Sequence, residues 1–158
     1  MQNSTISALD WQLIELLQKD SRTTISEIAK ILNRSRSTIS ERLERLLING
    51  VIQSFGAKVD AEKLGFGLKA FVRLSAESKN HRKIIETITQ FPEVSECHVL
   101  TGSELLILQV VAKDMAHLRS FVDGLTSYGS TQTDVVFATI KDGLVVDGKL
   151  RTKLESTS

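Results

Sequence analysis

The spacing of apolar residues changes once along the chain, close to Gly50, and this change limits the folds that the chain can adopt. Before Gly50 the apolar residues recur every three or four positions, which is typical of amphipathic helices. After Gly50 the period shortens towards two, first over residues 51–55, as in a half-buried strand. We therefore expect a helical unit followed by a unit that contains a sheet.

The composition is that of an ordinary globular protein. Of the 158 residues, 41% are hydrophobic and 25% are charged, the formal net charge is +1, and Cys97 is the single cysteine. These values exclude a disordered, collagen-like or disulfide-stabilised chain. No apolar run approaches the length of a bilayer span, and residues 1–8 lack the features of a signal peptide. We expect a cytoplasmic protein with no membrane partner.

Three short amphipathic helices are predicted before Gly50. Their apolar stripes are, in chain order, Leu9, Leu13, Leu16 and Leu17; Ile25, Ile28, Ala29 and Leu32; and Ile39, Leu43, Leu46 and Leu47. Thr24 and Glu27 fit a capping box at the start of the second helix. Asp10 and Ser35 are the expected caps of the other two helices, and Gly50 is expected to end the third in a left-handed conformation.

The second half of the chain repeats a simple order of strands and helices. Strands are expected at Leu68–Ser75, Val94–Leu100, Leu105–Val111 and Thr131–Ile140. The two helices between them carry inward-facing apolar side chains, namely Ile84, Ile85, Ile88 and Phe91 in one and Met115, Leu118, Phe121, Val122 and Leu125 in the other. This βαββαβ order is typical of a ferredoxin-like domain.

The third predicted strand has apolar side chains on both faces. Leu105, Ile107 and Val111 alternate with Leu106, Leu108 and Val110. Two helices on one face of a four-stranded sheet leave the other face bare, and the polar stretch 149–158 is a poor cover for it. A second copy of the chain is the expected cover, so we predict at least a homodimer. The alternative is that a central strand is often apolar on both faces without such a partner.

The clearest chemical signal lies between the second and third helices. They are joined by residues 33–36, which is about the length of the turn in a helix-turn-helix, whose later helix enters the DNA major groove. The residues expected to contact double-stranded DNA are Arg34, Ser35, Arg36, Ser37, Thr38, Glu41, Arg42 and Arg45. Those beyond the turn project from the face opposite the apolar stripe or from its flank, where they can read base edges.

Arg34 and Arg36, together with the free N–H groups of the helix N-terminus, suit phosphate contacts. The alternative is that this face is merely solvated and that its arginines form surface ion pairs of little energetic value. The strand expected after Gly50 resembles the start of a wing. The predicted fold class is therefore α+β, an N-terminal winged helix-turn-helix followed by a ferredoxin-like βαββαβ domain.

These features divide the chain into four expected segments. Residues 1–52 form the helix-turn-helix domain and 53–67 a hinge strand and linker. Residues 68–142 form a ferredoxin-like domain for oligomerisation and effector sensing, and 143–158 form a C-terminal tail.

Enzymatic chemistry finds little support among the candidate residues. His81, His98, His117 and Cys97 show no spacing typical of a metal site or a cysteine pair. Because Cys97 and His98 are adjacent on a predicted strand, their side chains should point to opposite faces. No catalytic residue, cofactor or metal ion is expected. A module that senses or assembles with protein through its helix-turn-helix remains an alternative to DNA binding.

The sequence resembles the Lrp/AsnC transcriptional regulators over almost its whole length. The first half carries the resemblance in Leu9–Arg22, Ile28–Lys30, Ser35, Arg42–Leu46 and Gly50–Ile52, and the second half in Val94–Gly102. This resemblance implies a sequence-specific DNA-binding regulator and not an enzyme. Certain haem-pathway decarboxylases share the architecture, so an enzyme related to them is a further alternative.

The resemblance also implies assembly and a small-molecule effector. Dimers of the family assemble further, into tetramers or octamers, and an amino acid or related molecule binds near the turn between the two middle strands. By position, the effector-binding residues are Thr101, Gly102, Ser103, Glu104 and Leu105, with Thr131 and Thr133 nearby. The family's turn carries two aspartates, at the positions that Ser103 and Leu105 occupy here, which weakens the expectation for an α-ammonium group.

Overall fold

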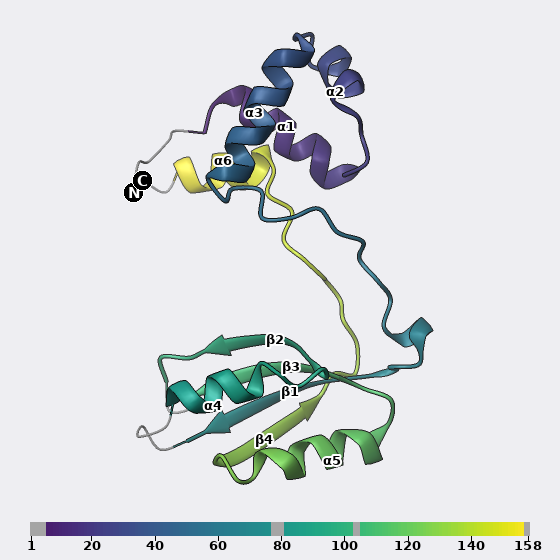
Figure 1. Ribbon diagram of the computed structural model, residues 1–158, viewed down its shortest axis with the longest axis vertical. Helices are drawn as coiled ribbons and strands as arrows, with labels where there is room; N and C mark the ends of the chain where they lie inside the picture. The colour runs from purple at the N-terminus through teal and green to yellow at the C-terminus, as the bar shows by residue number, and fades with distance from the viewer. Residues whose placement is uncertain (1–5, 77–80, 103–104, 157–158) are drawn as a thin grey trace. The chain divides into compact units, whose positions relative to one another are not determined.

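The computed structural model describes residues 6–76, 81–102 and 105–156, and its chain forms two compact units. The first unit comprises residues 1–58 and 142–158, and the second comprises residues 59–141. Figure 1 labels the helices and strands of both units. No helix in the described ranges is long and apolar enough to cross a membrane.

Three helices form the core of the first unit: α1 (Ala8–Lys19), α2 (Ile25–Ile31) and α3 (Arg36–Ile48). The predicted apolar stripes meet in one cluster of buried side chains, namely Leu13, Leu17, Ile28, Ala29, Ile39 and Leu46. Leu47, which was expected inside, is 40% exposed because it lies at the edge of the α3 stripe.

The start of each of these three helices is capped by a side chain. The predicted box at α2 is confirmed, since Thr24 N–H donates to Glu27 Oε2 over 2.8 Å and Glu27 N–H donates to Thr24 Oγ1 over 3.3 Å. Ser35 caps α3 as predicted. At α1, however, the cap is Ser7, and Asp10 is the third helical residue that completes a capping box with it. The prediction that Asp10 itself is the cap was wrong.

The end of α3 has the predicted glycine geometry. Gly50 has φ 67°, its N–H donates to Leu47 O, and the N–H of Val51 donates to Leu46 O, both over 2.9 Å. This pair of hydrogen bonds is the Schellman motif. The strand expected directly afterwards does not form, because residues 51–58, all of them described, have no partner strand to complete a hydrogen-bonded ladder.

The C-terminal segment, expected as a polar tail, packs on α1 in the first unit and contains the helix α6 (Gly148–Glu155). Gln18 holds the segment through two hydrogen bonds, donating to Val146 O over 2.7 Å and accepting from Val146 N–H over 3.0 Å. Gly148 N–H donates to Glu15 Oε1 over 2.7 Å. α1 is therefore packed against a part of the chain that is distant in sequence.

The second unit has the predicted ferredoxin-like order. A short 3-10 helix, η1 (Glu62–Leu64), precedes the elements β1 (Leu68–Ser75), α4 (His81–Ile88), β2 (Val94–Val99), β3 (Leu106–Ala112), α5 (Met115–Leu125) and β4 (Ser130–Val135). The four strands are antiparallel in the order β2-β3-β1-β4. β4 ends before the predicted Ile140 because β1, its neighbour, begins at Leu68, and the last bond is from Val136 N–H to Lys69 O.

Both helices of the second unit lie on one face of the sheet (Figure 1). The core on that face contains Val72, Leu74, Ile84, Ile88, Leu106, Leu108, Val110, Leu118, Phe121 and Leu125. Met115, expected inside, is 59% exposed at the first position of α5. On the opposite face, Phe71 lies beside Gln109, and Arg73 lies beside Ile107. Among the described elements of this unit, none covers that face.

Candidate nucleic-acid interface

The turn between α2 and α3 brings the first five of the predicted DNA-contacting residues, 34–38, to the N-terminal end of α3. Asn33 adopts a left-handed conformation with φ 50°, which asparagine tolerates better than most residues. The N–H of Arg34 donates to Ala29 O over 2.9 Å and closes the turn. This reversal presents the N-terminus of α3 and the exposed side chains of Arg36, Ser37 and Glu41 to solvent.

Three hydroxyl groups gather at the start of α3. Ser35 Oγ lies 2.9 Å from Ser37 Oγ and 2.7 Å from Thr38 Oγ1, and it also accepts a hydrogen bond from Thr38 N–H over 3.0 Å. Ser35 is therefore occupied in capping the helix. The remaining free N–H groups of this helix end favour an anion such as a phosphate.

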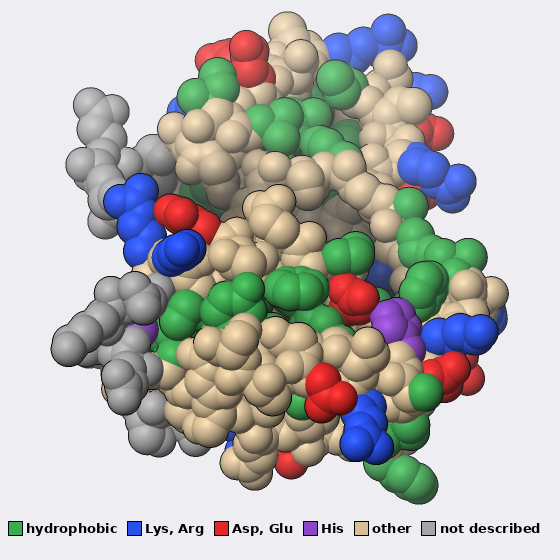
Figure 2. All heavy atoms as spheres, turned by 60° about the horizontal axis from the view of Figure 1, so that its bottom comes forward, with side chains coloured by type: hydrophobic (Ala, Val, Ile, Leu, Met, Phe, Trp, Pro, Cys, Tyr) green, Lys and Arg blue, Asp and Glu red, His purple; other side chains and the backbone are tan. Residues whose placement is uncertain are grey.

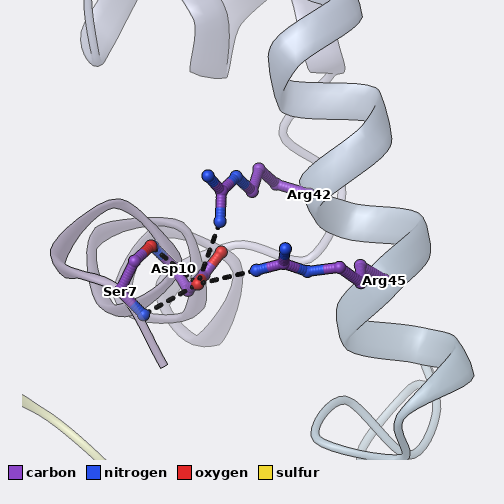
Figure 3. A network of polar contacts seen from close by, with 4 residues as sticks. All are labelled: Ser7, Asp10, Arg42 and Arg45. Carbon is purple, nitrogen blue, oxygen red and sulfur yellow. Dashed lines mark hydrogen bonds and ion pairs between the residues drawn. The ribbon is translucent and has the colours of Figure 1, made fainter. Parts of the chain in front are cut away.

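The arginines of α3 and of the turn before it fall into two groups. Within the described ranges, Arg34 and Arg36 form no ion pair, although Arg34 Nη1 donates to Asn33 O over 3.0 Å. Arg42 and Arg45 instead reach Asp10 on α1, with Arg42 Nη1 and Arg45 Nη2 each 3.5 Å from Asp10 Oδ2 (Figure 3). The sequence placed Arg45 on the exposed face and Arg42 on its flank; the structure directs both guanidinium groups towards α1.

Asp10 is the one buried charged residue among the described side chains, with 1% of its surface exposed. Its Oδ2 also accepts hydrogen bonds from Ser7 N–H over 2.8 Å and Ser7 Oγ over 2.7 Å. Burial alone would raise the pKa of Asp10, but the Ser7 hydrogen bonds and the charges of Arg42 and Arg45 outweigh it and hold the pKa below its ordinary value. The carboxylate is therefore charged at neutral pH.

Sequence reasoning noticed Asp10 only as a helix cap and missed its contact with α3. The capping box was the available local signal, because Ser7 and Asp10 have the required spacing. Nothing in the spacing shows which face of α3 will meet α1. On the face drawn in Figure 2, Lys and Arg side chains lie among Asp and Glu side chains instead of forming one basic field. On this face, positive charge is therefore not gathered into a single patch.

The residues predicted to bind an effector lie in two places, the turn between β2 and β3 and the strand β4. Thr101 and Gly102 are exposed in the turn between β2 and β3, whereas Ser103 and Glu104 lie outside the described residues. Leu105 is buried, and its N–H donates to Leu74 O over 2.8 Å, so neither its side chain nor its amide faces the turn's surface. Thr131 lies at the same end of the sheet, because it pairs with Leu74, but β1 separates its strand from β3.

Thr133 pairs with Val72 in the same ladder, so both threonines are on the helix-covered face and partly buried. Beside this end of the sheet is a hollow of about 670 Å³, lined in part by Ser75, Lys83, Thr126 and Tyr128. Sequence analysis did not single out these residues, since they come from separate elements and share no local pattern.

The candidate catalytic residues are separated from one another. Cys97 pairs with Leu108 and His98 with Ile107, which confirms that their side chains point to opposite faces. Burial raises the pKa of the Cys97 thiol, which makes it a weaker nucleophile. His117 contacts Glu93, with Nε2 and Oε1 3.1 Å apart. Within the described ranges, no group of His, Cys, Asp and Glu side chains is arranged to hold a metal ion.

Comparisons with known protein families cover both units. The profile described as the AsnC-type helix-turn-helix domain matches residues 6–47, and that described as the Lrp/AsnC ligand binding domain matches residues 69–146. A helix-turn-helix transcriptional regulator of Pyrococcus horikoshii is 32% identical over 145 residues, which cover 87% of this chain and 90% of that protein.

Two solved structures are similar to this chain over nearly the whole length of each solved chain. The structure of LrpC from Bacillus subtilis has a TM-score of 0.82 at 25% identity and covers 87% of this chain and 98% of the other. A transcriptional regulator of Neisseria meningitidis, solved as a complex with L-Met, has a TM-score of 0.83 at 29% identity and covers 92% and 99% of the two chains.

Proposed function

This chain belongs to the Lrp/AsnC family of transcriptional regulators, which bind DNA and are not enzymes, and from that premise we propose how it contacts DNA, itself and an effector. Its first unit is the helix-turn-helix DNA-binding domain, and its second is the ligand-binding domain. A regulator shares a compartment with its DNA, which supports a cytoplasmic location.

For DNA binding, we propose that α3 enters the major groove. The observation that carries this proposal is the solvent-exposed face of α3 beside the α2–α3 turn. Arg34 and Arg36 would contact phosphates together with the N-terminus of α3, and Ser37, Thr38 and Glu41 would read base edges. Ser35 would act mainly as the cap that keeps this helix end in place.

A mobility-shift titration with the DNA upstream of the protein's own gene tests this function. Binding should weaken steeply as salt rises, should survive unrelated competitor DNA, and should fall on Arg34→Gln plus Arg36→Gln. DNA binding would be refuted if neither this DNA nor any duplex from a pool of random sequences were shifted. A shift that resists salt would favour the protein-binding alternative.

For assembly, we propose that the uncovered sheet face joins two copies of the chain. Partly exposed apolar side chains on it, including Phe71, Ile107 and Val111, support this, because a second layer would remove them from water. Such a two-fold dimer would present two copies of α3 to a DNA site of two-fold character. Tetramers or octamers would require further contacts, and sedimentation velocity measures which species forms.

For the effector, we propose an amino acid or a related small molecule near Thr101 and Gly102. The complex of the Neisseria meningitidis relative with L-Met supports this class of ligand. Ser103, Glu104, Leu105, Thr131 and Thr133 complete the proposed set, with Leu105 acting through packing because it is buried. Calorimetry with L-Met and the other amino acids tests the proposal. Equal heats from the wild type and a Gly102→Val variant would contradict this location.

A further inference from the structure

We infer that Asp10 withholds Arg42 and Arg45 from DNA, so that the phosphate contacts of α3 come from the arginines at its N-terminus. The inference rests on the proposed DNA binding and assigns Asp10 a positioning role in it. Asp10 touches no DNA in this account, since it is buried between α1 and α3.

The geometry shows a single oxygen atom shared by two cations. Both guanidinium groups approach Oδ2, and each distance is 3.5 Å. These distances exceed the roughly 2.7–2.9 Å of a charge-assisted hydrogen bond, so the attraction is mainly coulombic. The second oxygen, Oδ1, is buried and has no hydrogen-bond partner among the described residues. Thus the charge of the carboxylate, and not a set of directional bonds, holds the two arginines.

Position and burial make this attraction effective. The Asp10 carboxylate is almost fully removed from water, whereas the Arg42 and Arg45 side chains are 32% and 49% exposed. Counterions screen such a pair less than they screen exposed charges. The long, partly exposed arginine side chains can still swing outwards if the carboxylate charge is removed.

The exposed arginines in the turn before α3 and at its first position are not held in this way. Arg34 and Arg36 form no ion pair within the described ranges, so no acidic group competes with a phosphate for them. For Arg42 or Arg45, a phosphate must compete with Asp10. The chain therefore withholds two cations of α3 from the sequence-independent part of DNA binding, which leaves more of the discrimination by this helix to side chains that read base edges.

The salt dependence of DNA binding measures how many arginines contact phosphates. Log K falls as log salt concentration rises, and each arginine that reaches a phosphate increases the magnitude of this slope by about 0.9. We compare the slopes as positive magnitudes. The experiment uses fluorescence anisotropy with a labelled duplex of unrelated sequence, over a salt series, on the full chain. The variants are Asp10→Asn, Arg42→Gln, Arg45→Gln and Arg36→Gln, and the matched control is Ser7→Ala, which loosens the start of α1 but keeps the carboxylate.

In the wild type, we expect Arg42→Gln and Arg45→Gln to leave the slope unchanged and Arg36→Gln to lower it by about 0.9. Asp10→Asn should raise the slope by about 0.9 for each arginine released, and Arg42→Gln placed in that background should then lower it. Ser7→Ala should change stability without changing the slope. If Asp10 has a purely structural role, Asp10→Asn should lower the melting temperature and should have the same slope as the wild type.

Two results would overturn the inference: equal slopes for the wild type and Asp10→Asn, or a loss of about 0.9 on Arg42→Gln or Arg45→Gln in the wild type. The second result decides the matter even if circular dichroism shows that Asp10→Asn does not fold. Failure of the proposed function is distinguishable from both, because the wild type would then bind neither this duplex nor a specific one.

Discussion

The Oδ2 atom of Asp10 lies 3.5 Å from Nη1 of Arg42, and this contact joins the first helix of the DNA-binding unit to the third. The carboxylate is buried and the Arg42 side chain is about one-third exposed, so the contribution of this ion pair to stability depends on the protonation of the carboxylate. The pKa of Asp10 is lower in the folded chain than its ordinary value, which links DNA-binding geometry to acid stability.

Acid should destabilise the wild type more than an Asp10→Asn variant. Because the folded pKa of Asp10 is depressed, its contribution is complete above its unfolded pKa of about 4 and is lost as pH falls through the folded pKa. Urea unfolding between about pH 6 and pH 2 measures the free energy at each pH. Parallel pH profiles of the wild type and the variant would contradict the expectation.

The variant should also be less stable at neutral pH, by about 1–3 kcal/mol, because the Asn side chain places a polar group at the buried Oδ1 position, which has no hydrogen-bond partner among the described residues. Glu27, whose pKa is lowered by its hydrogen bonds with Thr24, contributes a separate part of the acid dependence. Glu27→Gln is the control that removes this part and retains a capping residue.

The capping box of α2 should be a measurable source of stability. Thr24→Ala removes the side chain that accepts from Glu27 N–H, and the free energy of unfolding should fall by about 1 kcal/mol. Thr24→Ser keeps the hydroxyl and should stay within about 0.5 kcal/mol of the wild type. Chemical denaturation gives both values, and an equal loss in the two variants would mean that the methyl group matters instead.

Two glycines of the second unit should respond in opposite ways to alanine. A Cβ at Gly129 would lie 2.1 Å from the carbonyl oxygen of Ser75, so Gly129→Ala must displace the backbone and should lower the melting temperature by several degrees. At Gly124 in α5, no neighbouring atom lies within 4 Å of a new Cβ, so Gly124→Ala should stabilise by about 0.5–1 kcal/mol. Thermal melts followed by circular dichroism compare them, and tolerance of Gly129→Ala would refute this close approach.

A charge on the uncovered sheet face should prevent assembly. Val111→Asp places a carboxylate where we propose that a second copy packs. Removing that charge from water is unfavourable even though Lys69 lies opposite residue 111 in the β1–β3 ladder, because both charges would lose their hydration. Met115→Asp, at a position 59% exposed on α5, is the matched control. Sedimentation velocity should show smaller species for Val111→Asp alone. An unchanged distribution in that variant would place the interface elsewhere.

Local patterns predicted the elements of this protein well. The Thr24 box, the Ser35 cap and the left-handed Gly50 all depend on hydrogen bonds between residues three to five positions apart, which the sequence spells out directly. The order βαββαβ follows from the alternation of apolar periods in the same way. Asp10 was misplaced by this reasoning, because the true cap Ser7 lies outside the apolar pattern that marked the helix start.

The predictions from sequence were wrong where contacts between distant segments determine the structure. The length of β4 depends on where β1 begins, and the C-terminal segment is held by Gln18, 128 positions away from Val146. The same is true of the candidate site, because the pairing of Arg42 and Arg45 with Asp10 depends on the rotation of α3 against α1.

The sequence by itself thus determined the helices, the strands, their caps and the supply of arginines on α3, because each is set by residues within one or two turns. Only the tertiary structure decided which of those arginines remain free. A buried carboxylate attracts whichever cations packing brings within a few ångströms, and no local pattern records that approach.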